Sequence, residues 1–223
     1  MLLFLAGLVI FSYPSIKGEQ LETAAADSIV QFVEAKKTER EQTSFSILYP
    51  ELFQEMQMYN QRIFEEKQSG LKDKFSYAEP SFILSDYGLE TETIAVLNIP
   101  VLDLSMPVYL GANEENMAAG AAHMSNTSLP VGGNNTNCVI AGHRGWSGAD
   151  YFKHLDTLKE GDSVELVTLW NTLNYTVSEI QIIEPYEVEQ IMIQEGRDLL
   201  TLLTCHPYAS GGRYRYLVIC ERS

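Results

Sequence analysis

Residues 199–208, LLTLLTCHPY, and residues 214–220, YRYLVIC, carry the clearest structural signal in the chain. Both runs are rich in Leu, Ile, Val, Thr and Tyr, which is the composition of β-strands. The Ser210-Gly211-Gly212 cluster between them is typical of a turn. The two runs therefore predict two consecutive strands near the C-terminus.

Runs of the same kind recur from residue 93 onward. They are separated by turn clusters such as residues 132–135, GGNN, and residues 160–162, EGD. Many short strands with turns between them predict a mainly β domain, a barrel or a sandwich, rather than an alternating βαβ sheet. Residues 151–158, YFKHLDTL, are expected to form one short helix. The other expected strands are residues 93–99, 106–110, 137–142, 163–169 and 174–183.

The N-terminal part has a helical composition instead. Residues 21–64 are rich in Ala, Glu, Lys, Gln and Met, and Pro50, preceded by Ser44 and Ser46, predicts two helices with a break between them. Residues 65–92 mix charges with Gly and Pro, so we expect a linker or long surface loop there. Two apolar stripes at helical spacing are expected to pack on the core, with a partner-binding face as the alternative: Leu52, Met56, Tyr59 and Ile63, and earlier Ile29, Phe32 and Val33.

The first sixteen residues, MLLFLAGLVIFSYPSI, contain no charge. The run is shorter than the roughly 20 apolar residues that span a bilayer. It also lacks the basic start and small-residue cleavage site of a signal peptide. We interpret residues 1–17 as a signal-anchor whose beginning is missing; the alternative is a short buried core helix.

Charge excludes one large class of function. The chain has 223 residues with a formal net charge of −15, and its hydrophobic fraction of 45% is ample for a packed core. Nucleic-acid binding depends on cationic side chains that replace counterions along the phosphates. We therefore expect no nucleic-acid partner, and anionic lipid headgroups are disfavoured for the same reason.

The three cysteines are too few for a disulfide scaffold and lack the paired spacing of a zinc site. Cys138 and Cys220 lie within apolar runs. Cys205 ends its run, because Pro207 cannot continue a strand ladder. The end of a strand is held rigidly and opens onto a cleft, where a side chain can reach a substrate. Cys205 is therefore the best candidate nucleophile, with a structural thiol as the alternative.

A thiol needs a base near neutral pH, since the reactive form is the thiolate. His143 lies between glycines directly after a predicted strand, which matches the position expected for Cys205. His123 follows a small-residue run and is expected to be packed, and His154 is expected on an exposed helix. His206 neighbours the thiol, but adjacent strand residues point to opposite faces. Taken alone, each of these histidines is more often structural than catalytic.

Acyl transfer also needs a donor for the developing oxyanion. Arg213 and Arg215 both follow Cys205 closely, at the start of the last predicted strand. An arginine at a strand start is usually a solvated surface charge, so composition alone does not choose between them.

Several motifs in this half of the chain resemble one enzyme family. Residues 201–205, TLLTC, resemble the T-L-x-T-C signature of sortases, the transpeptidases of Gram-positive surface proteins. Residues 215–218 resemble their R-x-x-V segment, and residues 142–145 their G-H-R-G segment. Together with shorter matches, this resemblance covers about residues 93–222. The TSLP-x-GG and C-x-P-Y details, with Tyr13-Pro14 after the anchor, look most like the class C, pilus-polymerising branch.

The resemblance implies an eight-stranded sortase β-barrel at residues 93–223, preceded by helices, anchored in the membrane and lying outside the cell. It implies Cys205 as nucleophile, His143 as general acid/base and Arg215 as the group that positions substrate and stabilises the oxyanion. The implied reaction cleaves an L-P-x-T-G-like sorting signal between Thr and Gly through a thioacyl-enzyme. A lysine amine of a pilin subunit then resolves the intermediate. No metal and no cofactor are implied.

Some features depart from the class C pattern. The Asp-Pro-aromatic lid of many members corresponds here to Ser85-Asp86-Tyr87-Gly88, without the proline, so residues 80–92 are only a possible lid. Many class C members also have a second hydrophobic anchor at the C-terminus, whereas the sequence here stops at Glu221-Arg222-Ser223. The spacing after Cys205 is one residue longer than usual, which keeps Arg213 as an alternative to Arg215.

These departures keep other functions open. One is a sortase that attaches proteins to the peptidoglycan cross-bridge, and another is a catalytically silent assembly scaffold. A cysteine hydrolase that releases peptides to water is a further possibility.

Overall fold

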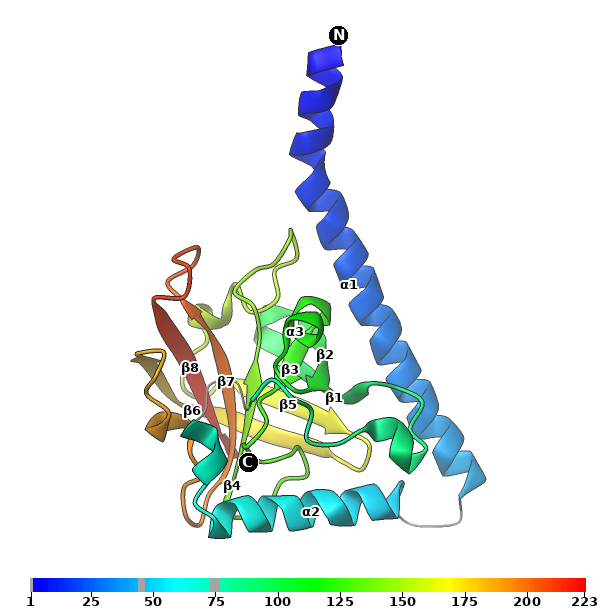
Figure 1. The fold of residues 1–223 in the computed structure, drawn as a ribbon, viewed down its shortest axis with the longest axis vertical. Helices are drawn as coiled ribbons and strands as arrows, with labels where there is room; N and C mark the ends of the chain where they lie inside the picture. Colours follow the sequence, from blue (N-terminus) through cyan, green and yellow to red (C-terminus); the bar gives the residue numbers. More distant parts are fainter. Residues whose placement is uncertain (1, 44–46, 73–76) are drawn as a thin grey trace.

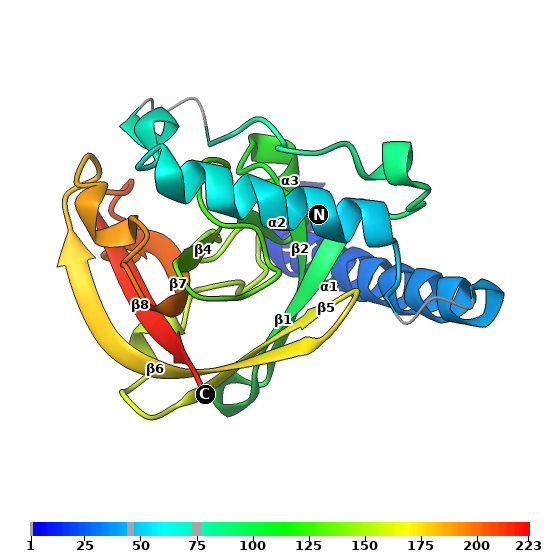
Figure 2. The same cartoon turned by 90° about the horizontal axis from the view of Figure 1, so that it is seen from below.

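A closed barrel of eight strands forms the centre of the molecule (Figures 1 and 2). The computed structural model describes residues 2–43, 47–72 and 77–223. The strand order is β1-β2-β3-β4-β7-β8-β6-β5, which confirms the prediction of a mainly β, eight-stranded barrel with helices before it. The strands are β1 (Thr93–Ile99), β2 (Leu104–Leu110), β3 (Ala121–His123), β4 (Thr136–Ala141), β5 (Ser163–Thr168), β6 (Thr172–Ile183), β7 (Asp198–His206) and β8 (Tyr214–Arg222).

The pairing of the strands decides which residues can meet. β2–β3 and β4–β7 pair in parallel, and the other neighbours pair antiparallel. β4 is buried along its whole length, whereas β5 alternates between buried and more exposed residues. This alternation is expected of a strand with one face on the core. The adjacent ends of β4, β7 and β8 therefore form one rigid edge of the barrel.

Two long helices pack on the outside of the barrel. α1 (Leu2–Gln42) runs beside β1 and β2, and α2 (Pro50–Glu65) crosses below the barrel in the view of Figure 1. The predicted break at Pro50 is confirmed, and proline suits the first turn of a helix because its missing N–H would have no partner there. Ser44 and Ser46 lie outside the described residues. Within the part of the chain that the structure describes, no helix has both the length and the apolar character needed to cross a bilayer.

The predicted helix stripes are largely confirmed. On α2, Leu52, Met56 and Ile63 are buried and Tyr59 is half-buried. On α1, Phe32 is buried but Val33 is 54% exposed, so this part of the prediction was wrong. Adjacent helical residues point about 100° apart, and α1 contacts the barrel along a narrow stripe only.

Two further elements differ from the sequence prediction. β3 was not predicted, because its three residues, two alanines and a histidine, are too short a run to show strand periodicity. The helix expected at residues 151–158 is reduced to the 3₁₀ turn η4 (Leu155–Thr157). Tyr151 has a φ of 42°, and the Phe152 N–H donates to the His143 carbonyl at 3.0 Å. The N–H groups of Leu155, Thr157 and Leu158 bond to carbonyl oxygens three residues earlier, which is the 3₁₀ pattern, whereas an α-helix bonds four residues back.

The chain between α2 and β1 has little regular structure. Its described residues contain only two 3₁₀ turns, η1 (Ser69–Lys72) and η2 (Leu84–Tyr87). Leu84 and Leu89 are buried in the core cluster, which fixes the second half of the segment against the barrel. The other short helices are α3 (Glu114–Ala119), η3 (Pro100–Leu102) and η5 (Glu189–Ile191).

Candidate active site

The three residues expected to carry chemistry meet at the edge formed by β4, β7 and β8. Cys205 lies directly opposite Arg215 in the antiparallel β7–β8 pair. Ala141 lies beside Leu203 in the parallel β4–β7 pair. His143 and Cys205 each come two residues later on their own chain segments, so they lie beside one another. Side chains two apart on a strand share a face, and all three side chains line one cavity.

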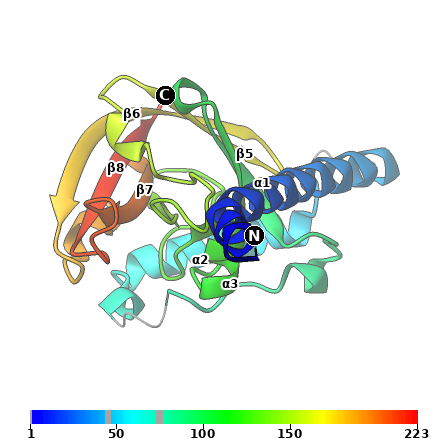
Figure 3. The ribbon, with the colours of Figure 1, turned by 90° about the horizontal axis from the view of Figure 1, so that it is seen from above.

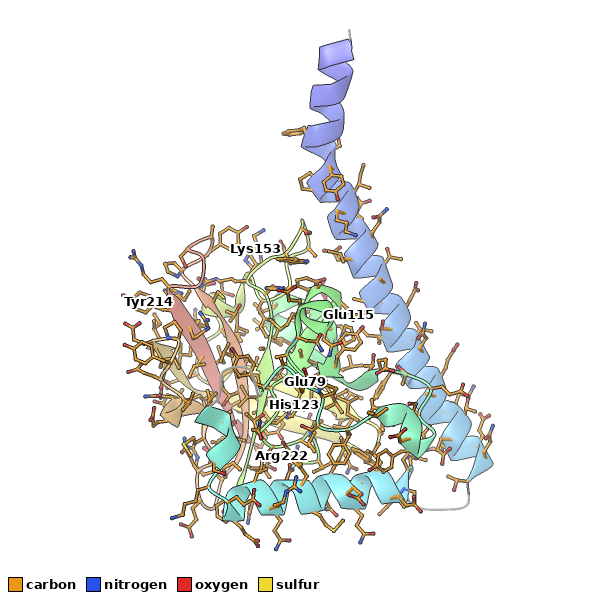
Figure 4. All side chains as sticks on the ribbon, viewed as in Figure 1. Glu79, Glu115, His123, Lys153, Tyr214 and Arg222 are labelled. Atoms are coloured by element: carbon orange, nitrogen blue, oxygen red, sulfur yellow. The ribbon has the colours of Figure 1, made fainter. Side chains whose placement is uncertain are left out.

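This cavity has a volume of about 570 Å³ and mostly apolar walls. It is large enough for several residues of an extended peptide. In Figure 4, Tyr214 (next to Arg215) and Lys153 lie at the upper end of the barrel, whereas His123 lies within it. Besides the three candidate residues, the apolar lining includes Leu71, Tyr77, Ala112, Met117, Met124, Ile183, Pro185, Val188, Ile191 and Leu203.

Gly212 lies close to both the thiol and the guanidinium. A Cβ placed on Gly212 would be 3.2 Å from Cys205 Sγ and 3.1 Å from Arg215 Nη1. The same Nη1 donates hydrogen bonds to the carbonyl oxygens of Gly212, at 2.8 Å, and Tyr214, at 3.2 Å. These bonds hold the cation next to the sulfur. Arg213 is exposed and does not line the cavity, so the geometry favours Arg215 as the candidate.

His143 is held by an aromatic ring that sequence reasoning did not single out. The imidazole stacks on Trp146 with ring centroids 4.4 Å apart and an interplanar angle of 11°. Partial burial lowers the pKa of His143 below its ordinary value of about 6.5. The free imidazole is therefore mostly neutral at pH 7 and able to accept a proton. A stacking partner three residues later depends on loop geometry, which leaves no pattern in the sequence.

The remaining histidines are occupied elsewhere. His123 is fully buried with its Nε2 3.0 Å from the Ser128 carbonyl oxygen, and burial lowers its pKa to about 4. His154 lies on a loop, not a helix, with its Nε2 3.4 Å from an Asp150 carboxylate oxygen. His206 stacks on Tyr216 at 5.5 Å. None of the three lines the cavity.

Arg144, the neighbour of His143, contacts residues of the strands that carry the rest of the site. Its side chain is only 6% exposed and forms an ion pair with Asp156. Arg144 Nη1 lies 2.7 Å from His206 Nδ1 and 3.5 Å from the Cys205 carbonyl oxygen, and the guanidinium lies over the Tyr216 ring. This one side chain therefore links the loop after β4 to the ends of β7 and β8. Its role needs a charged partner twelve residues away, which no sequence motif marks.

The other two thiols are structural in character. Cys138 and Cys220 are buried and no cysteine is in a disulfide. Burial raises the pKa of Cys220 to about 12 and also raises that of Cys138. Cys205 is thus the cysteine that reaches the cavity. Among the described residues, no group of three or more His, Cys, Asp or Glu side chains is arranged to hold a metal ion.

The segment considered as a lid lies away from this cavity. Tyr87 packs on Phe82 at 6.1 Å, and Phe82 packs on Tyr59 of α2 at 5.9 Å. Within the chain between α2 and β1, the residues that line the cavity are Leu71 and Tyr77, which come before residues 85–88. Ser85-Asp86-Tyr87-Gly88 therefore does not cover the thiol in this structure.

Comparison with known proteins agrees with this geometry. The family model of the Sortase domain matches residues 97–223. The chain belongs to the sortase family. Members of this family are cysteine transpeptidases, and solved structures of class C sortases are among those that this sortase resembles.

Two solved structures illustrate the likeness. Sortase C1 of Streptococcus agalactiae is 30% identical, with a TM-score of 0.74 over 89% of this chain and 95% of the other. Sortase C of Clostridium perfringens, solved with the C-terminal cell wall sorting motif, is 31% identical with a TM-score of 0.66 over 78% of this chain and 89% of the other.

Similarity to curated sequences is confined to a shorter region. Sortase D of Bacillus subtilis is 24% identical over 57% of this chain and 62% of its own length. The match to sortase A of Bacillus anthracis covers 58% of that protein, so the chain spans about three fifths of the length of these relatives.

Proposed function

We propose that this sortase is a pilus-type transpeptidase that cleaves an L-P-x-T-G-like sorting signal between Thr and Gly. It then joins the new carboxyl end to a lysine amine of a pilin subunit. The observation that carries the proposal is that Cys205, His143 and Arg215 line the same mostly apolar cavity. The C. perfringens sortase C solved with a sorting motif supports this substrate class.

In the proposed first half-reaction, Cys205 attacks the carbonyl carbon of the Thr–Gly peptide bond. The neutral His143 ring takes the thiol proton as the C–S bond begins to form. Arg215, held by the Gly212 and Tyr214 carbonyl oxygens, donates to the oxyanion of the tetrahedral intermediate. His143 then gives its proton to the departing glycine amine, and the C–N bond breaks. A thioester to Cys205 remains.

In the second half-reaction, a neutral lysine amine attacks the thioester carbonyl. His143 accepts the amine proton and returns it to the leaving Cys205 sulfur, which regenerates the free enzyme. The apolar walls, Met124, Ile183 and Leu203 among them, would receive the Leu and Pro side chains of the signal. We further propose that residues 1–17 attach the protein to the membrane with the barrel outside the cell.

Mass spectrometry of the full chain in mild detergent tests the proposal. The chain is incubated with an L-P-x-T-G peptide plus either a lysine-bearing peptide or an oligoglycine peptide, beside Cys205→Ala. We expect a thioester adduct and a lysine-linked product, both absent from Cys205→Ala. An oligoglycine-linked product alone would point to cross-bridge anchoring, and product from water alone to a hydrolase. No adduct at all would contradict the proposal and indicate a silent scaffold.

A further inference from the structure

The loop that follows His143 is in backbone contact with α1. A Cβ on Gly148 would lie 1.9 Å from the Pro14 carbonyl oxygen. A Cβ on Gly18 would lie 2.6 Å from the carbonyl carbon and oxygen of Gly148. Close-packed backbone cannot yield by this amount, so both positions require glycine. Gly148 also has a φ of 94°, which itself favours glycine.

From this contact, a short chain of interactions leads to the imidazole. Ala149, next to Gly148, is buried in the core. Ala149 and Trp146 exchange two backbone hydrogen bonds, at 2.8 and 2.9 Å. Trp146 in turn stacks on His143 at 4.4 Å. A shift of Gly148 would therefore move the ring against which His143 rests.

α1 is suited to hold this loop because it is fixed to the barrel elsewhere. Phe32 is fully buried, Tyr109 Oη donates to Ser28 Oγ at 3.0 Å, and Lys36 Nζ donates to the Thr168 carbonyl oxygen at 2.6 Å. Figure 3 shows the N-terminal half of the helix at the barrel end where the loop after β4 lies. Gly18 is buried although Glu19 beside it is exposed.

We propose that Gly18 and Gly148 are positioning residues for His143. The helix holds the loop at residues 145–149 in place, the loop holds Trp146, and Trp146 sets the orientation of the imidazole relative to Cys205. The inference rests on the proposed function, since it gives His143 a proton-transfer role. It also makes α1 a part of the active-site support rather than only a connection to residues 1–17.

Gly18→Ala in the full chain tests this proposal. Alanine favours a helix over glycine, so the change strengthens α1 while its Cβ pushes on the Gly148 carbonyl. Small displacements of a proton-transfer group lower turnover strongly, so we expect kcat to fall about tenfold or more with KM within about twofold. Gln20→Ala, an exposed change two residues away on the same helix, is the matched control and should leave both constants unchanged.

A second readout does not depend on turnover. The chain has two tryptophans, so in a Trp170→Phe background the tryptophan emission, excited selectively over that of tyrosine, comes from Trp146 alone. An imidazolium quenches a stacked indole, and the pH-dependent part of the emission therefore reports the His143–Trp146 stack. We expect Gly18→Ala to loosen the His143–Trp146 stack and so to reduce the pH-dependent part of the emission by about half or more. Gln20→Ala should leave that part unchanged.

The outcomes separate the two proposals. If Gly18→Ala alters the emission titration and the unsubstituted chain itself forms no peptide product, the link from the two glycines to the His143–Trp146 stack stands and the proposed function is contradicted. Emission and kcat equal to those of Gln20→Ala would overturn the positioning role. Gly148→Ala approaches the same contact from the loop. Loss of cooperative unfolding in both glycine variants would also overturn the inference, because the contact would then serve folding.

Discussion

Removal of the Asp156 carboxylate should lower the free energy of unfolding, because it leaves the buried Arg144 charge without its ion-pair partner. The Arg144 side chain is 6% exposed and that of Asp156 is 41% exposed. Loss of one partner from a fully buried ion pair costs about 3–5 kcal/mol, and loss of an exposed pair costs about 0.5 kcal/mol. Because water reaches Asp156, we expect an intermediate cost of about 2 kcal/mol for Asp156→Ala, or about 4–8 °C in Tm.

Urea unfolding followed by circular dichroism measures this change, as a lower midpoint with an unchanged slope. Asp150→Ala is the matched control, since Asp150 pairs on the same loop with the exposed Lys153 at 2.7 Å. It should cost at most about 0.5 kcal/mol. Arg144→Met added to Asp156→Ala should recover part of the loss, because it removes the unpaired cation. Equal effects of Asp156→Ala and Asp150→Ala would refute the view that Arg144 depends on this partner.

Three further predictions concern single side chains. Arg215→Ala should lower kcat by about 10²–10³ without a change in the unfolding midpoint. Arg213→Ala should keep kcat within about twofold of the parent value. Peptide-ligation kinetics measure both, and the reverse result would assign the role to Arg213. Because burial lowers the pKa of His143, the acidic limb of the kcat/KM profile should fall below about pH 6.5, and a limb above that value would contradict the assignment. Buried His123, with a pKa of about 4, stays neutral while the unfolded chain binds a proton below about pH 6.5. Stability should therefore decline by about 3 kcal/mol as the pH falls from 6.5 to 4, and urea titrations of His123→Gln should show a flatter decline.

The strand-like runs of the sequence predicted most of the barrel, and the resemblance to sortases indicated the three residues that meet in the cavity. Strand-like runs in residues 93–220 identify seven of the strands because each has enough Val, Ile, Leu and Thr to show. The missed strand, Ala121–His123, pairs through backbone only and has no such signature. The prediction of a helix at residues 151–158 was wrong because Tyr151 has a positive φ and the hydrogen bonds that follow it run three residues back rather than four.

What surrounds His143 could not be predicted in the same way. The stacking of Trp146 depends on a loop conformation. The contact between Gly18 and Gly148 joins positions 130 residues apart, as their numbers give (148 − 18), through bare backbone. Such interactions arise only when the whole barrel has closed, and a local pattern of residue types does not record them.

The parallel pairing of β4 with β7 has a consequence for the order of folding. Cys205 and Arg215 lie on consecutive antiparallel strands, ten positions apart (215 − 205), so a local hairpin brings them together. His143 is 62 positions before Cys205 (205 − 143) and joins only when β4 docks on β7. Local contacts form before distant ones because the entropy of closing a loop grows with its length. During refolding the thiol should therefore meet its cation first and its base last.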